Sequence, residues 1–269
     1  MRPIILFPGL LFTVLLSACS IKEERTFCPC RLTLNLEDAN IKFPGEELHL
    51  WFTDEQNVPI MKTIVSSSQE NVKVIVPKGR IRVFSTTGSD VWKDSEEGGR
   101  LELETGNQAD SIYASCSLIE CTGETAADTI LLHKQWCTAH ILLDQSEKWE
   151  SSLFELNSSW AGLSTSSLGA LKGDFICHAV KAGERRLTVR IPRQGDDSLV
   201  LKIKEQNSKD GENTREKTFP LGEMIASIGY QWDKADLDDI VIRLNETKSG
   251  LYVELEDWEE AFSPEDVEF

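Results

Sequence analysis

Residues 73–84, Lys-Val-Ile-Val-Pro-Lys-Gly-Arg-Ile-Arg-Val-Phe, decide the fold class of this chain. The pattern has a period of two on both sides of Pro77-Lys78-Gly79. This period predicts two strands joined by a turn, because successive side chains of a strand point to opposite faces of its sheet. The same period recurs at 31–36, where a first strand is expected. The stretch therefore predicts a β-sheet protein.

Short apolar runs of this kind continue along the chain, separated by Gly, Asn, Asp and Pro. Their number exceeds that of one simple sandwich and predicts an all-β fold of two tandem β-sandwiches. A single helix is expected at 221–228, between Pro220 and Gly229, because its apolar residues follow helical spacing. Strands are expected at 47–53, 58–65, 99–104, 111–118 and 128–133, and in a second series at 137–143, 151–157, 173–180, 185–191, 198–204, 238–244 and 250–256.

The N-terminus has the pattern of an export signal. Arg2 is followed by an apolar run, 4–16, that is shorter than the ~20 residues of a membrane-spanning helix. Leu16-Ser17-Ala18-Cys19 resembles the bacterial lipobox, which implies cleavage before Cys19 and a diacylglycerol on its thiol. The alternative is an ordinary secretory signal that ends beside a cysteine. Lys22-Glu23-Glu24 resembles the export signal of surface lipoproteins in Bacteroidales. We therefore expect an outer-membrane lipoprotein that faces outward, anchored by lipid at Cys19.

These patterns divide the chain into five parts. We expect a signal peptide at 1–18, a lipidated tether at 19–27, an N-terminal β-sandwich at 28–134, a C-terminal β-sandwich at 135–258 and an acidic tail at 259–269. The boundary near 134 follows from Lys134-Gln135, which separates two strand-like runs.

The charge of the chain limits its partners. The precursor has a net charge of −17, and removal of residues 1–18 takes away one arginine and leaves −18. The isoelectric point is near 4.7. This balance argues against binding to nucleic acid or to an anionic membrane surface, both of which need basic patches. Solubility is the default explanation for the excess negative charge.

Six cysteines remain besides Cys19, and an even number in an exported chain makes them candidates for disulfides. Six cysteines allow 15 pairings, and the sequence does not choose among them. Cys28 and Cys30 are separated by one proline, so a bridge between them would be strained and at least one is expected to reach a distant strand. No metal-binding spacing is present, and no metal or cofactor is predicted. The six are Cys28, Cys30, Cys116, Cys121, Cys137 and Cys177.

No sequence motif indicates an enzyme. A phosphate loop, a Gly-x-Ser-x-Gly elbow and a His-Glu-x-x-His helix are all missing from the sequence. The segment 236–239, Asp-Leu-Asp-Asp, suggests either a calcium ligand set or a solvated strand entry, and the second is favoured because no oxygen-rich loop follows. The four histidines fall within strand patterns and are expected to be sheet residues: His49, His133, His140 and His178.

Four tryptophans are assigned from their context. Trp51, Trp136 and Trp258 lie in strand patterns and are expected in cores. Trp92 lies in the turn-rich stretch 88–95, where we expect it to be exposed. An exposed aromatic ring is what a sugar-stacking platform needs. This motivates an alternative function, that of a glycan-binding outer-membrane surface lipoprotein.

A set of segments, in order from about 27 to 258, resembles the FimB-type fimbrial anchor and minor-subunit proteins of Bacteroidales. The segments are Phe27-Cys28-Pro29-Cys30-Arg31-Leu32-Thr33-Leu34, Leu50-Trp51-Phe52-Thr53, Val76-Pro77-Lys78-Gly79, Ile191-Pro192-Arg193-Gln194 with Asp197-Ser198-Leu199, Phe219-Pro220-Leu221-Gly222, Gly229-Tyr230-Gln231-Trp232, Leu237-Asp238-Asp239-Ile240 and Glu256-Asp257-Trp258.

This resemblance implies a non-enzymatic, lipid-anchored protein of two transthyretin-like Greek-key β-sandwiches. It also implies a role as anchor or accessory subunit of a type V fimbria, with fimbrial subunits as partners through β-strand complementation. The tail after Trp258 is short, acidic and interrupted by Pro264, which makes it a poor donor strand. The partner contact is therefore expected on a sheet edge that the sequence does not identify.

Overall fold

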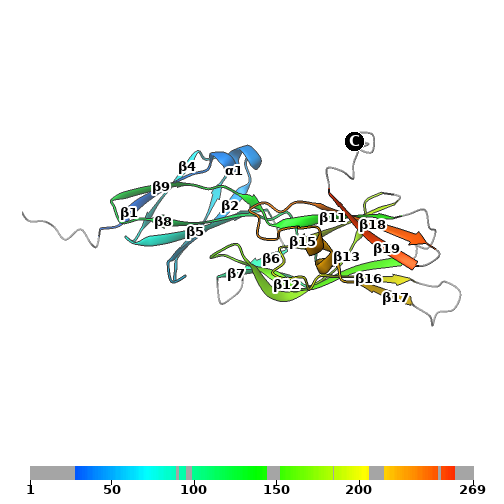
Figure 1. The fold of residues 1–269 in the computed structure, drawn as a ribbon. Helices are drawn as coiled ribbons and strands as arrows, with labels where there is room; N and C mark the ends of the chain where they lie inside the picture. The colour runs from blue at the N-terminus through cyan, green and yellow to red at the C-terminus, as the bar shows by residue number, and fades with distance from the viewer. Residues whose placement is uncertain are drawn as a thin grey trace, which may run out of the picture.

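The computed structural model describes residues 28–88, 91–94, 99–143, 152–183, 185–205, 215–247 and 250–257. These residues form four sheets and two short helices, arranged as two sandwiches that lie end to end (Figure 1). The all-β class and the pair of tandem sandwiches predicted from the sequence are confirmed. The division of the chain at residue 134 stays a prediction.

The first sandwich packs a three-stranded sheet on a five-stranded sheet. In the three-stranded sheet, β1 lies between β4, its antiparallel partner, and β9, its parallel partner. The five-stranded sheet has the order β10-β8-β5-β2-β3, and helix α1 connects β1 to β2. The bounds are β1 Cys30–Asn35, α1 Glu37–Lys42, β2 Glu47–Asp54, β3 Pro59–Ser66, β4 Asn71–Val76, β5 Arg80–Thr87, β8 Tyr113–Glu120, β9 Thr125–Thr129 and β10 His133–Lys134.

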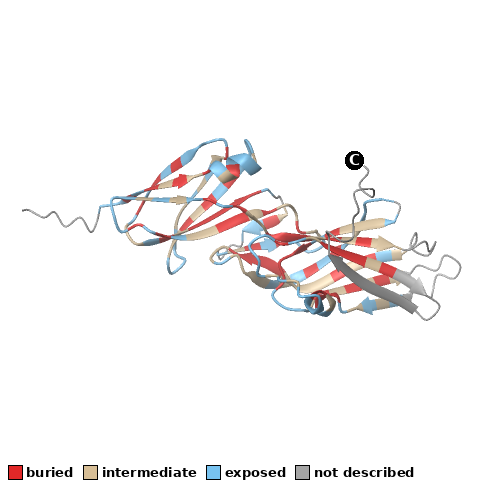
Figure 2. Ribbon diagram, turned by 45° about the horizontal axis from the view of Figure 1, so that its top comes forward, coloured by how far each residue is buried: buried red, intermediate tan, exposed pale blue. Residues whose placement is uncertain are grey.

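The period-two stretch 73–84 forms most of β4 and the first half of β5, but these two strands are not partners. β4 pairs with β1, whereas β5 pairs with β2 and β8. The turn at 77–79 carries the chain from one sheet to the other. Val74 and Val76 therefore enter the core from one side, and Ile81 and Val83 enter it from the other. Buried and exposed residues alternate along β4, whereas β5 is buried continuously from Val83 to Thr87 (Figure 2).

The second sandwich repeats the central arrangement of the first. β11 lies between the antiparallel β15 and the parallel β18, as β1 lies between β4 and β9. One sheet has the order β14-β15-β11-β18-β19 and the other the order β17-β16-β12-β7-β6, with β13 also paired to β12. The bounds are β6 Trp92–Asp94, β7 Arg100–Leu103, β11 Trp136–Leu143, β12 Ser152–Ser164, β13 Ala170–His178, β14 Val180–Lys181, β15 Arg186–Pro192, β16 Val200–Glu205, β17 Arg215–Phe219, α2 Leu221–Ser227, β18 Ile240–Thr247 and β19 Gly250–Asp257.

Two strands from the first half of the chain complete a sheet of the second sandwich. β6 pairs with β7, and β7 pairs with the end of β12. β12 can serve both β16 and β7 because it is 13 residues long and changes register twice, around Trp160. Gly162 stands at the second irregularity, where a Cβ atom would come within 2.9 Å of Leu171 Cβ. A glycine is therefore needed where the neighbouring strand approaches most closely.

Most predicted elements are found, but one predicted strand is wrong and four elements were not predicted. The helix at 221–228 is confirmed and ends at Ser227, followed by Gly229 at φ +79°. The strand expected at 128–133 is wrong: β9 ends at Thr129 and β10 begins at His133. Between them Ile130 and Leu132 are buried, so the apolar pattern continues where the strand does not. Helix α1 and strands β6, β14 and β17 were not indicated by the sequence.

A partly buried carboxylate ties three strands of the second sandwich together and predicts a pH dependence. Glu155 of β12 accepts hydrogen bonds from Asn157 and Lys204, each at 2.9 Å, and lies 3.8 Å from Lys202 and 3.5 Å from His178. The hydrogen bond from Asn157, followed by the one from Lys204, lowers the pKa of the Glu155 carboxyl to about 2, against the effect of burial.

Because this pKa is lowered in the folded state, Glu155 stabilises the fold above a pH of about 4.5, and this contribution is lost as the pH falls towards 2. We expect the wild type to lose on the order of 2 kcal/mol of unfolding free energy over this range that Glu155→Gln does not lose. Denaturant unfolding at pH 7 and pH 3 measures the difference. Equal losses in the two proteins would contradict the assignment.

Candidate assembly edge and clamp between the sandwiches

The four sheets leave several strands with a neighbour on one side only. Such a strand presents a row of backbone N–H and C=O groups that can pair with a strand from another chain. An edge that accepts a strand should meet three conditions. It should be long, its free side should not be covered by another segment, and its core-facing side chains should still be partly exposed. The edge strands among the described residues are β3, β4, β6, β9, β10, β13, β14, β17 and β19.

Most of these edges do not meet the three conditions. The free side of β13 is covered by the loop before β8, where Gly106 N–H donates to the Ile176 carbonyl at 3.0 Å and the Gln108 amide donates to the His178 carbonyl at 3.1 Å. The three core-facing valines of β4 are already at most 9% exposed. β6, β10 and β14 have two or three residues, and β9 and β17 have five. β19 is longer, but its side chains lie outside the described residues.

β3 meets all three conditions. It has eight residues and, among the described strands, pairs only with β2. On β2 the core-facing side chains of Leu48 and Phe52 are fully buried, whereas their partners on β3, Val65 and Met61, remain partly exposed. A further strand beside β3 would complete the burial of this side of the first core.

The backbone of β3 has hydrogen-bonding groups directed to its free side. Ser67 N–H donates to the Glu46 carbonyl at 2.8 Å, which continues the β2–β3 ladder in register. Residues of an antiparallel strand alternate between those that bond to a given neighbour and those that face away from it. Lys62 and Ile64 therefore direct their N–H and C=O groups away from β2. The Ile64 side chain on this edge is 56% exposed.

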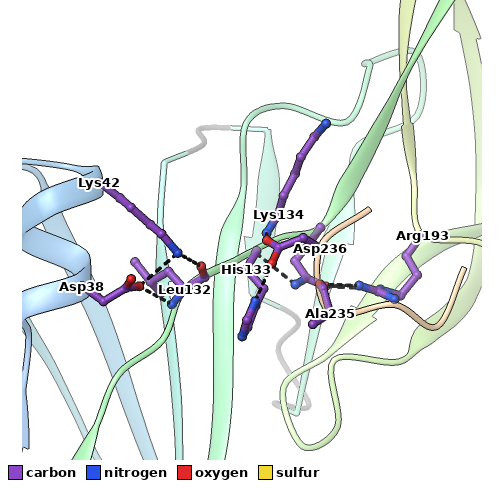
Figure 3. A network of polar contacts seen from close by, with 9 residues as sticks. Asp38, Lys42, Leu132, His133, Lys134, Arg193, Ala235 and Asp236 are labelled. Carbon is purple, nitrogen blue, oxygen red and sulfur yellow. Dashed lines mark hydrogen bonds and ion pairs between the residues drawn. The ribbon is translucent and has the colours of Figure 1, made fainter. Parts of the chain in front are cut away.

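A second candidate feature is a chain of polar contacts that runs from helix α1 across the connection between the sandwiches (Figure 3). On the side of the first sandwich, Lys42 Nζ lies 3.1 Å from the Asp38 carboxylate and donates to the Leu132 carbonyl at 3.0 Å. Asp38 also accepts the Leu132 N–H at 3.2 Å. The last residues before the connection are thus fixed to α1.

On the side of the second sandwich, two aspartates hold the connecting residues. Asp236 lies 2.8 Å from His133 Nδ1 and accepts the Lys134 N–H at 2.7 Å. Burial disfavours the charged Asp236 carboxylate, but these two hydrogen bonds outweigh it and keep its pKa below the ordinary value. Asp239 accepts the Lys134 ammonium at 2.5 Å and the Thr138 N–H at 2.7 Å.

We call these contacts, together with those of Arg193, the inter-sandwich clamp (residues 38, 42, 132–135, 193 and 230–239). Arg193 lies in its interior. The guanidinium donates to Gln135 Oε1 from Nε at 3.2 Å and from Nη2 at 3.0 Å. It also donates to the Ala235 carbonyl at 3.2 Å and to the Trp232 carbonyl. Arg193 is 6% exposed, and burial lowers its pKa from the ordinary value.

The clamp collects segments that the sequence singled out separately. The stretches 191–194, 229–232 and 237–240, which carry part of the family resemblance, lie far apart in the chain and meet around Arg193. The three segments contribute contacts to one structural feature, the connection at 133–135. The segment 236–239, considered above as a strand entry or a calcium ligand set, supplies the two aspartates that bind the connecting residues.

Trp92 is buried, and the expected exposed ring is wrong. At 8% exposure it packs in the core that includes Leu101 and Leu103 of the same hairpin. The antiparallel pairing of β6 with β7 carries the indole into the core of the second sandwich. A cleft of about 400 Å³ adjoins it, lined also by His49 and Trp51. The glycan-stacking platform predicted at Trp92 is therefore not present.

The other tryptophans and the histidines are placed as follows. Trp136 is buried as predicted, Trp51 is partly buried against the same core, and Trp258 lies outside the described residues. His49, His133, His140 and His178 all lie on strands, as predicted. Within the described ranges, no three His, Cys, Asp or Glu side chains gather into a metal-binding group. No described helix has the length and apolar character of a membrane span.

All six candidate disulfide cysteines are thiols in the structure. Cys30 and Cys121 are in side-chain contact, and burial first, then the neighbouring Cys30 thiol, raises the pKa of Cys121 to about 11. Cys137 instead contacts Tyr230, and Cys116 donates to a backbone carbonyl at 3.5 Å. The other two are Cys28, which is exposed, and Cys177, which is fully buried. Cys19, the signal 1–18, the tether 19–27 and the tail 259–269 lie outside the described residues.

Solved structures with this fold are known from Bacteroidales. The fimbrial anchor protein Mfa2 from Porphyromonas gingivalis matches with a TM-score of 0.62 at 12% identity, over 86% of this chain and 98% of Mfa2. The chain has the fold of Mfa2. The resemblance predicted from the sequence is thereby confirmed at the level of the fold, and it extends over nearly the whole length of Mfa2.

Two further structures are similar. A Bacteroides thetaiotaomicron protein provisionally described as polysaccharide-binding matches with a TM-score of 0.60 at 13% identity, over 88% of this chain and all of that one. A Bacteroides ovatus protein provisionally described as an adhesin matches with a TM-score of 0.58 at 12% identity, over 86% and 94% of the two chains. Neither a protein-family model nor a curated protein sequence matches the chain.

Sequence reasoning missed the two features that the structure makes prominent. The β3 edge depends on which strands pair, and pairing is not visible in a period-two pattern. Arg193 lies among other charged residues, Arg190 before it and Asp196 after it, so the sequence contains no signal that this arginine, unlike Arg190, is buried and hydrogen-bonded.

Proposed function

We propose that this protein is a non-enzymatic surface lipoprotein that acts as an anchor or accessory subunit of a type V fimbria. The observation that carries this function is the fold shared with the fimbrial anchor Mfa2 across both sandwiches. The lipobox-like sequence ending at Cys19 supplies the membrane attachment such a subunit needs. The strongly acidic composition agrees with an exposed, soluble body outside the membrane.

The partner binds by adding a strand to β3. β3 offers eight residues of uncovered edge, outward backbone groups at Lys62 and Ile64, and core-facing side chains that one more strand would cover. Main-chain hydrogen bonds would supply affinity, and the partly exposed Met61 and Val65 would receive side chains of the incoming strand. The partner is a subunit of the same fimbria that offers an extended segment with alternating apolar residues.

The inter-sandwich clamp supports an anchoring role because an anchor must transmit force. The tether precedes β1 of the first sandwich, and the connection at 133–135 is one of the places where the chain passes from the first sandwich to the second, beside the crossings before β6 and after β7. Hydrogen bonds from α1 on one side, and from Asp236, Asp239 and Arg193 on the other, hold that connection in place. The two sandwiches would then move as one rigid body rather than as two domains joined by a flexible linker.

Replacement of the lipidated cysteine tests this function. In cells that make Cys19→Ser, we expect the chain to incorporate no labelled fatty acid and to be missing from the outer-membrane fraction. Fimbriae should then be shed into the medium, because each buried methylene of the lipid contributes about 0.8 kcal/mol to anchoring. Cys28→Ser, nine residues further along the chain, is the matched control and should keep both the label and the attached filaments. Unlabelled wild-type chain, or attached filaments in Cys19→Ser cells, would contradict an anchor.

A further inference from the structure

Two buried thiols meet where the folded body of the protein begins. Cys30 is the first residue of β1 and faces Val76 of β4 in the ladder. Cys121 directly follows β8, and it exchanges two backbone hydrogen bonds with Gly79, N–H to carbonyl at 2.7 Å and carbonyl to N–H at 3.3 Å. Gly79 lies in the turn that follows β4. The start of β1, the turn after β4 and the end of β8 therefore share one corner of the first sandwich.

The side chains of this corner face each other inside the core. Cys30 and Cys121 are both fully buried and belong to the same apolar cluster. Their thiols contact each other, whereas the Cys137 thiol contacts Tyr230 and the Cys116 thiol donates to the Thr165 carbonyl. Of the 15 pairings that six cysteines allow, the fold thus favours those that contain this pair.

We propose that Cys30 and Cys121 form a disulfide in the mature protein. Each thiol loses its proton, the two sulfurs form one S–S bond, and the two electrons pass to the disulfide of a thiol–disulfide oxidoreductase, which leaves as a dithiol. This inference rests on the proposed export of the chain, because such bonds persist in oxidising compartments. The bond forms before the corner closes, since the folded corner excludes both solvent and a protein oxidant from these thiols.

The proposed bond has a mechanical consequence for an anchor. Tension on a lipid tether enters the folded body at β1, which an end-on pull would peel from β4 and β9 one hydrogen bond after another. A Cys30–Cys121 bond passes that tension directly to the end of β8, which lies between β5 and β10 inside the five-stranded sheet. The roughly 90 residues between the two cysteines then carry no load. At about 3.3–3.6 Å per residue, this prevents about 300 Å of chain extension under tension.

Peptide mapping of the whole mature chain tests the bond. Without reduction, trypsin should yield peptide 26–31 joined to peptide 101–134, and reduction should separate them with a gain of two hydrogens. Each peptide contains two cysteines, so four variants identify the linked pair. Cys28→Ser and Cys116→Ser should keep the joined product, whereas Cys30→Ser and Cys121→Ser should lose it. The first two substitutions leave this corner intact, so they show that the loss of a cysteine from either peptide does not by itself remove the joined product.

Two further measurements complete the test. Reduction should lower the Tm of the wild type by roughly 10 °C and leave that of Cys121→Ser unchanged. The chain isolated from cell envelopes is compared with the same chain oxidised in vitro by glutathione disulfide. Separate peptides in both samples overturn the bond and leave the anchor function standing. A joined product only after oxidation in vitro overturns the bond as a native modification and also counts against export.

Discussion

The Ile64→Pro variant is expected to lose the capture of fimbrial subunits while keeping its fold. Ile64 directs its N–H away from β2, so proline removes a donor from the free edge and no bond from the β2–β3 ladder. Proline is tolerated on edge strands when its missing N–H faces outward. An incoming strand would meet the pyrrolidine ring of the introduced proline instead of an N–H donor. The carbonyl of the incoming strand that should accept this N–H would be left unpaired. This costs about 1–3 kcal/mol, or roughly a tenfold to hundredfold loss of affinity.

Crosslinking on whole cells, followed by recovery of the chain with its bound subunits, measures this effect. Ile64→Ala is the matched control, because it removes the exposed side chain but keeps the outward N–H, and it should retain most of the crosslinked partner. Thr63→Pro is the opposite control: it removes a bond to Leu50 of β2 and should lower the Tm. Wild-type levels of capture by a folded Ile64→Pro variant would exclude β3 as the acceptor.

The strands were predictable from the sequence because burial on one face of a strand imposes a period of two. The stretch 73–84 shows both the strength and the limit of this signal. It predicted β4 and β5 within a few residues, but it carried no information that they belong to opposite sheets. Pairing is decided by contacts between distant residues, as between Cys30 and Val76 or Val83 and Ser117. A local pattern does not contain those contacts.

The same limit explains what was missed at the candidate sites. Trp92 lies in a stretch of turn-forming residue types, but β6 and β7 join β12 from the other half of the chain, and the indole is buried in that core. The β3 edge is open because β3 is the last strand in the order of its described sheet. That order follows from the strand pairing and is not visible in a local sequence pattern. The cysteines were recognised as a set, since their number and the export signal suffice for that, whereas their proximity depends on the corner at Gly79.

The inter-sandwich clamp should depend on Arg193 more than on any exposed charge around it. Arg193→Ala leaves Gln135 Oε1, which is buried, and the partly buried carbonyls of Trp232 and Ala235 without their donor. Each unsatisfied acceptor costs about 1–3 kcal/mol, partly relieved by water that enters the space. We expect a net loss of about 3 kcal/mol and a Tm lower by roughly 6–12 °C, measured by calorimetry.

The Arg193 variant should also expose the connection to proteases. The backbone N–H of Lys134 is held by Asp236 and its side chain by Asp239, so trypsin should cleave after Lys134 slowly in the wild type and faster in Arg193→Ala. Arg190→Ala is the matched control three residues earlier, because Arg190 is half-exposed and paired with Asp110 at 3.2 Å, a surface pair worth less than about 1 kcal/mol. If the two alanine variants melt and are cleaved alike, Arg193 does not hold the sandwiches together, and the force path through the clamp must run elsewhere.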